Sequence, residues 1–178
     1  MVLLPFIVVI AKAQGCAYAG EGGCAANLID PTPLAVRVVG DVCRKLNIQQ
    51  LYVFQASVQN ACASNLADGT PIITYNNQFL NNLYQQNSWA PVSVLAHEVG
   101  HHYNADATWF GQFSHPWTRE LRADFVSGYV LFKLGASLED SQSAFRIIFS
   151  AVGSESHPDT PTRMQALAAG YLRAYQGF

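Results

Sequence analysis

The sequence predicts an α+β fold that is mainly helical and carries one small sheet in its first half. Runs of β-branched and aromatic residues are confined to Leu51–Val58 and Pro71–Tyr75. From Pro91 onward, the apolar residues recur at helical spacing instead. The chain has 178 residues, of which 50% are hydrophobic, and this suits a single domain with one core.

The first residues have the features of an export signal. Met1–Ile10 is almost entirely apolar, and the small-x-small triplet that follows it is of the kind that signal peptidase cuts. The apolar run is shorter than the roughly 20 residues that span a bilayer. We therefore expect residues 1–13 to be a signal peptide and residues 14–178 to form one exported domain, periplasmic or secreted, without a membrane-spanning segment. One alternative is that the apolar run is a buried first element of the fold. The other is a lipobox that ends at Cys16, for which the glutamine at Gln14 is a poor fit.

The cysteines indicate disulfides rather than a zinc site. Cys16, Cys24, Cys43 and Cys62 lack the Cys-x-x-Cys spacing of zinc ligands. The sequence does not choose among the three possible pairings, although Cys16 with Cys24 and Cys43 with Cys62 is the most local one. Four buried thiols would instead require a reducing compartment.

The first helix and the sheet are predicted from local signals. Thr32 and Pro33 suit the cap and the first residue of a helix that continues to about Leu46. The segment Asn65–Gly69 has the residues of a turn, so the strand-like runs around it predict a small antiparallel sheet before the helix that follows.

Several helices are predicted in the second half. The first covers Pro91 to about Tyr103, and the second covers Thr118–Leu134 and should end at Gly135. Ser137 begins a capping-box pattern, and the last helix should run from Thr160 towards Tyr175.

The charge pattern argues against a nucleic-acid partner. Only 12% of the residues are charged, the formal net charge is -2, and no run of Lys or Arg is present that could follow a phosphate backbone.

His97 and His101 predict a metal site. They are four residues apart on a predicted helix, so both imidazoles project from nearly the same face and can bind one ion. Glu98 lies about 100° around the helix from His97 and is suited to act as the general base that takes a proton from the attacking water. A zinc ion that keeps an open position for water still needs a third protein ligand. The alternative is a helix whose histidines only form hydrogen bonds.

Glu120 and Asp124 are predicted to complete that site. They are four residues apart on the next predicted helix, and two like charges on one face repel unless a positive group lies nearby. We expect Glu120 to be the third ligand and Asp124 to accept the second N–H of a ligand histidine. The alternative is a pair of surface salt bridges to Arg119 and Arg122.

Three segments together resemble the gluzincin zinc peptidases, in particular the HtpX-like group that also contains the CaaX-processing prenyl-protein protease. Val94–His101 resembles the active-site helix of that family, Arg119–Asp124 its Glu-x-x-Ala-Asp helix, and Ser156–Met164 its His-Pro segment with an arginine six residues after the histidine. The resemblance implies a zincin-type domain, makes Glu120 the metal ligand, and covers roughly Leu51 to the end of the chain.

The resemblance also gives roles to residues that the pattern alone would leave on the surface. His157 would stabilise the oxyanion that forms when water attacks the peptide carbonyl. Arg163 would orient His157 or pair with Asp124. Pro71–Asn76 resembles a strand whose exposed edge pairs with an extended substrate. His102 is expected to be exposed, and His115 to lie between the motifs.

The expected function is therefore that of a zinc metalloendopeptidase with one ion, acting on a protein or peptide. An exported zinc-binding interaction module, or a peptidase held inactive by residues 14–30, is the alternative. Imidazole and carboxylate also accept other first-row metals.

Overall fold

The computed structural model describes residue 24 and residues 27–108, 111–148 and 152–177. The predicted signal segment and Cys16 lie outside these residues. The elements follow one another as α1 (Pro33–Leu46), β1 (Tyr52–Gln55), β2 (Ala61–Asn65), β3 (Pro71–Tyr75), α2 (Asn77–Gln86), α3 (Ala90–Tyr103), η1 (Gly111–Phe113), α4 (Pro116–Leu134), α5 (Leu138–Ser141), α6 (Ser143–Ile148) and α7 (Thr160–Tyr175). The α+β class and the mainly helical second half are as predicted.

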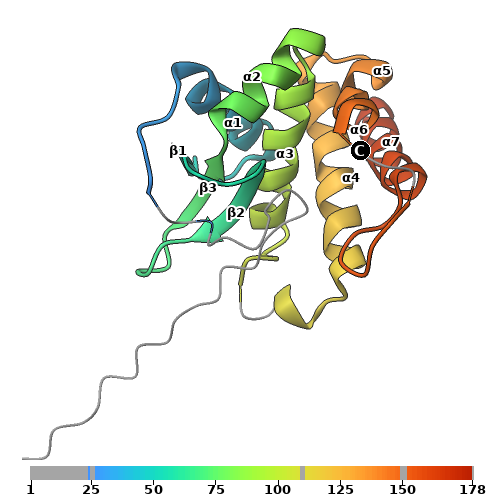
Figure 1. The fold of residues 1–178 in the computed structure, drawn as a ribbon. Coiled ribbons are helices and arrows are strands. Elements are labelled where there is room, and N and C mark those ends of the chain that lie inside the picture. Colours follow the sequence, from blue (N-terminus) through green and yellow to red (C-terminus); the bar gives the residue numbers. More distant parts are fainter. Residues whose placement is uncertain (1–23, 25–26, 109–110, 149–151, 178) are drawn as a thin grey trace, which may run out of the picture.

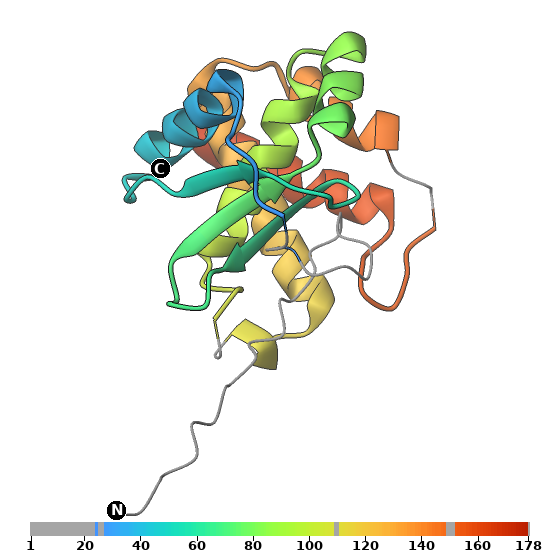
Figure 2. The same ribbon diagram turned by 60° about the vertical axis from the view of Figure 1, so that its left-hand side comes forward.

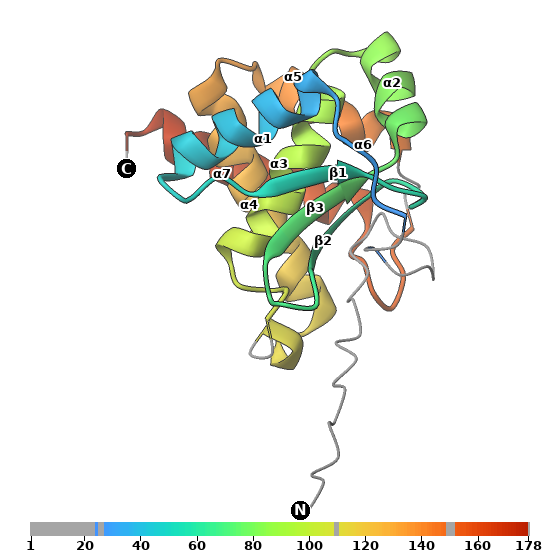
Figure 3. The same cartoon turned by 90° about the vertical axis from the view of Figure 1, so that its left-hand side faces the viewer.

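The layers are arranged around α3, which lies between the sheet and the remaining long helices. Figure 1 shows the sheet on one side of α3, with α4 and then α7 on the other side. Figure 2 and Figure 3 show the strands lying across α3, with α1 beside them. The helix that carries the predicted metal motif is therefore the centre of the molecule, and eleven of its residues are buried, from Ala90 and Pro91 through Ser93–His101.

The sheet is mixed and does not have the predicted antiparallel arrangement. The strand order is β1-β3-β2, in which β1 runs parallel to β3 and β2 runs antiparallel to it. The predicted turn is present, and Gly69 adopts a left-handed φ of 86° there. The strand that precedes this turn is β2, however, whose small residues carry little strand preference. The stronger run at β1 pairs with the other edge of β3.

Most predicted helix ends agree with the structure because local capping determines them. The Thr32 side chain accepts the Ala35 backbone N–H, and Gly135 ends α4 at a φ of 94°. Ser137 caps α5 by accepting the Asp140 N–H. The helix α4 begins at Pro116, two residues before the predicted start. The helix α2, which is rich in Asn and Gln, was not predicted.

The cysteine pairing, which the sequence left open, is not the most local one. Cys24 forms a disulfide with Cys62 on β2, across a separation of 38 residues. Cys43 is instead a buried free thiol on α1, and burial raises its pKa. A disulfide of this kind is typical of an oxidising, exported location. No helix among the described residues is long and apolar enough to cross a membrane.

Candidate metal centre

The predicted site residues come together between α3 and α4. His97, Glu98 and His101 lie on α3, and Glu120 and Asp124 lie on α4. All five are buried, and none is more than 5% exposed. Buried ionisable groups are rare unless they are paired or bind a metal. The helices approach closely here because small residues face each other: a Cβ atom at Gly100 would lie 3.0 Å from the backbone of Ala123.

The candidate ligand atoms form a small triangle. The Nε2 atoms of His97 and His101 are 3.0 Å apart. The Glu120 carboxylate oxygens lie 3.4 Å from the first of these atoms and 3.5 Å from the second. Atoms bonded to a tetrahedral ion at about 2.0–2.1 Å lie about 3.3 Å from one another. The three side chains could therefore hold a metal ion.

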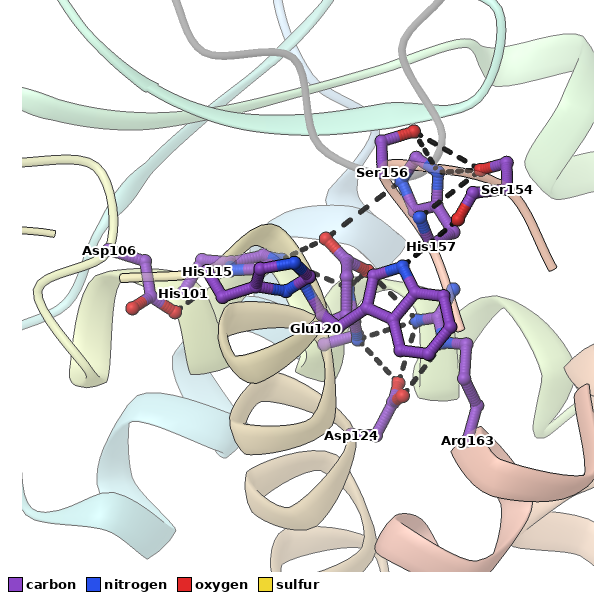
Figure 4. A network of polar contacts seen from close by, with 11 residues as sticks. His101, Asp106, His115, Glu120, Asp124, Ser154, Ser156, His157 and Arg163 are labelled. Atoms are coloured by element: carbon purple, nitrogen blue, oxygen red, sulfur yellow. Dashed lines mark hydrogen bonds and ion pairs between the residues drawn. The ribbon is translucent and has the colours of Figure 1, made fainter. Parts of the chain in front are cut away.

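Asp124 and Arg163 lie directly behind this triangle. Asp124 Oδ1 is 2.8 Å from Nδ1 of His97, which is the contact predicted for a supporting carboxylate. Arg163 reaches in from α7 and donates two hydrogen bonds of 2.8 Å to the same carboxylate. Its Nη2 also lies 3.2 Å from Glu120. Figure 4 shows Asp124 and Arg163 on one side of Glu120 and His157 on the other.

The electrostatics of the site favour a bound cation. Burial alone would lower the pKa of His97, but Asp124 and Glu120 outweigh it and raise that pKa to about 9. Burial would raise the pKa of Glu120, but the histidines and Arg163 around it hold that pKa well below its usual range. The pKa of Asp124 is also lowered, because Arg163 and His97 outweigh the effect of burial. Two carboxylates thus face one arginine, and a proton or a metal ion can supply the missing positive charge.

Glu98 differs from its neighbours in having no partner of this kind. Its carboxylate is fully buried, and neither oxygen has a hydrogen-bond partner among the described residues. A buried carboxylate without a partner costs folding free energy, and groups of this kind are found mainly at functional sites. Glu98 directly follows His97 on α3 and lies about 100° around the helix axis from it.

His157 is brought to the same site by the loop before α7. Its Nε2 lies 4.0 Å from Glu120 Oε1, and its side chain is 26% exposed. On the opposite side of the ring, the Ser156 hydroxyl lies 2.7 Å from Nδ1 and the Ser154 hydroxyl 3.3 Å from it (Figure 4). Burial lowers the pKa of His157, and the cationic Arg163 contributes to this against the effect of Glu120. Burial and Arg163 therefore both disfavour the protonated form of the ring.

Three neighbouring residues make contacts that the sequence did not predict, and the expectation that His102 is exposed is wrong. Arg122 does not pair with Glu120; it pairs with Asp106, and Arg163 supplies the positive charge at Glu120. His102 is not exposed, because its Nε2 lies 2.9 Å from the carbonyl oxygen of Ile72 on β3, and burial lowers its pKa. His115, which had no predicted role, caps α4 by accepting the Trp117 backbone N–H.

The predicted substrate-binding edge is also wrong. Pro71–Tyr75 is β3, the central strand of the sheet, and β1 and β2 occupy its two edges. Ile72, Ile73, Thr74 and Tyr75 are all completely buried. The edge was expected from the family resemblance alone, whereas the apolar run of this segment is typical of a strand covered on both faces.

Sequence reasoning missed Asp106, which contacts His101 from the loop after α3. Its position depends on that loop rather than on any periodic spacing, so only its residue type could have drawn attention to it.

No protein-family profile, curated protein or solved structure matches the chain.

Proposed function

We propose that this protein is a zinc-dependent endopeptidase with a zincin-type domain of the gluzincin kind. The observation that carries the proposal is the triangle of His97, His101 and Glu120 atoms, together with a buried, unpartnered carboxylate on Glu98, the residue that follows His97 on α3. Two histidines and a glutamate form one of the ligand sets of catalytic zinc, in which the fourth position stays open. A site that served structure alone would have no use for a buried carboxylate without a partner.

Each side chain is assigned a role in peptide hydrolysis from its chemistry and its place in the site. When bound, zinc would act as a Lewis acid that polarises the scissile carbonyl and lowers the pKa of the attacking water. Glu98 takes a proton from that water and passes it to the leaving amine. Asp124 accepts the Nδ1–H of His97, which leaves the Nε2 lone pair directed at the metal position.

His157 would stabilise the negative charge that develops on the peptide oxygen. The Ser156 hydroxyl can donate to Nδ1 of His157, and the ring proton then resides on Nε2, on the side of Glu120. A neutral imidazole in this state is a hydrogen-bond donor for an oxyanion. Arg163 acts on Asp124 and Glu120 rather than on the reacting atoms.

The proposed location is outside the cytoplasm, periplasmic or secreted. The Cys24–Cys62 disulfide and the apolar first residues support it. The proposed substrate is a protein or peptide cut at an internal bond. The endopeptidase assignment rests on the resemblance of three segments to the gluzincin peptidases.

The test is metal-dependent cleavage by the purified protein. The full chain and a form that begins at Gln14 are incubated with casein and with internally quenched peptides. We expect cleavage that a chelator abolishes and zinc restores, with other first-row metals compared in the same assay. An exported zinc-binding module would bind the metal without cleaving anything. Absence of chelator-sensitive cleavage by both forms would overturn the proposal.

A further inference from the structure

A second carboxylate lies behind the other candidate ligand, His101. Asp106 Oδ2 is 3.1 Å from Nδ1 of His101, and Asp106 is only 4% exposed. Its contact repeats the one that Asp124 makes with His97. In each case the carboxylate contacts Nδ1, and Nε2 is left facing the other ligand atoms.

The loop that presents Asp106 is held in an uncommon conformation. It leaves α3 at Tyr103, and Ala105 has a φ of 58°, a left-handed value that is unfavourable for alanine. The turn brings the Asp106 backbone N–H within 2.9 Å of the His101 carbonyl oxygen. A residue held in a disfavoured conformation indicates that something nearby requires its position.

Two further contacts fix this loop from outside. A Cβ atom at Gly111 would lie 2.4 Å from the carbonyl oxygen of Asp106, so the chain can return past the loop only with glycine there. The Asn65 side chain, at the end of β2, donates a 2.8 Å hydrogen bond to the carbonyl oxygen of Ala107. The loop therefore packs against the segment that precedes α4 and is hydrogen-bonded to the sheet.

Each carboxylate also has its own arginine. Arg163 pairs with Asp124 from α7, and Arg122 pairs with Asp106 Oδ1 from α4. The Arg163 side chain is completely buried, whereas that of Arg122 is 41% exposed. Because Arg122 uses one oxygen of Asp106, the other oxygen remains available to His101.

We propose that Asp106 is a positioning residue of the metal centre: it accepts the Nδ1–H of His101, directs the Nε2 lone pair at the ion, and is itself held in place by Arg122. This inference rests on the metal site of the proposed function. Carboxylates in this position raise the basicity of a ligand histidine and fix its tautomer, and their loss typically weakens metal binding by about 10–100-fold.

The test is the zinc dissociation constant of the full chain and its variants, measured by competition with a chromophoric chelator, with the melting temperature recorded for each. Asp106→Asn is the main variant, and Asp41→Asn, in the exposed Asp41–Arg44 pair of α1, is the matched control. We expect the dissociation constant to rise about 10–100-fold for Asp106→Asn and to change less than about twofold for Asp41→Asn.

Arg122→Gln separates positioning from a purely structural role of this loop. If Asp106 served only to tie the loop to α4, both variants would lower the melting temperature alike and leave zinc affinity unchanged. Positioning predicts a much larger loss of affinity for Asp106→Asn than for Arg122→Gln, because the second variant leaves the contact with His101 intact.

The outcomes distinguish this inference from the proposed function. Wild-type protein that binds no zinc would overturn both. Wild-type protein that binds zinc, with Asp106→Asn binding equally well, would overturn only the inference. If Asp106→Asn does not fold, nitrogen NMR of the zinc-loaded wild type decides: the inference requires His101 to carry its proton on Nδ1 in a hydrogen bond, and a proton on Nε2 contradicts it.

Discussion

Arg163 and Asp124, which are 39 residues apart in the chain, form an ion pair in which both side chains are buried. Two hydrogen bonds of 2.8 Å join the guanidinium to the two carboxylate oxygens. The Arg163 side chain is 0% exposed and that of Asp124 1%. Since Asp124 also contacts His97, this pair connects α7 to the candidate ligands.

Arg163→Met should destabilise the protein strongly. It leaves Asp124 as a buried carboxylate without its main cation, and breaking a buried pair in this way costs about 3–5 kcal/mol. Arg163→Lys should retain part of that stability, since an ammonium group keeps the charge but cannot form the paired hydrogen bonds. Urea unfolding measures both, with Arg37→Met on the exposed face of α1 as the control. Equal stability of Arg163→Met and Arg37→Met would contradict this account of the pair.

The contact between α4 and α7 should not tolerate a methyl group at Gly170. A Cβ atom there would lie 1.8 Å from the carbonyl oxygen of Phe125, which is backbone and cannot move aside. Gly170→Ala should therefore separate the two helices and cost about 3 kcal/mol or more. Separation would also move Arg163 away from Asp124, so zinc affinity should fall with stability.

Gly40→Ala is the matched control for that substitution. Gly40 also lies inside a helix, but its added Cβ atom would meet only the ends of two flexible side chains, Gln50 at 3.4 Å and Arg44 at 3.5 Å. Since these side chains can move aside and alanine is the better helix former, Gly40→Ala should change the free energy of unfolding by about 1 kcal/mol or less, towards greater stability. Thermal and urea unfolding compare the two variants, and a fully stable Gly170→Ala would show that the helices are not packed as described.

The features that local sequence determines were predictable, and those that depend on distant packing were not. His97 and His101 share a helix face because of their spacing alone, and the Thr32 cap fixes the start of α1. The position of β2 could not be predicted, because its small residues have no strand signal and only pairing with β3 makes it a strand.

Glu120 and Asp124 were predictable as a pair on one helix face, but their partners were not. Arg122 is closer in sequence but pairs with Asp106. Arg163 reaches Glu120 from α7 because α4 and α7 pack together. Asp106 itself reaches His101 through the left-handed Ala105. A residue placed by a single unusual loop conformation leaves no periodic signal in the sequence.

The Cys24–Cys62 bond should contribute substantially to stability. The two residues are separated by 38 positions, and closing a loop of that length removes unfolded-state entropy equivalent to about 4 kcal/mol at 25 °C. A reductant should lower the melting temperature of the wild type but not that of a Cys24→Ser, Cys62→Ser double variant.

Cys43→Ala is the control for the disulfide. Cys43 is buried and not in a disulfide, so its replacement should leave a small cavity while the response to reductant stays the same as in the wild type. Peptide mapping under non-reducing conditions should recover Cys24 joined to Cys62. If the reductant left the melting temperature of the wild type unchanged, the presence of this disulfide would be contradicted.

The most direct test of the central claim is Glu98→Gln, measured for zinc content and for peptide cleavage on the same preparation. The amide has the shape of the carboxylate but cannot accept the proton of the attacking water. Glu139→Gln, on the exposed side of α5, is the matched control. We predict that Glu98→Gln binds as much zinc as the wild type and cleaves nothing, while Glu139→Gln keeps both properties. Unchanged chelator-sensitive cleavage by Glu98→Gln would contradict the account.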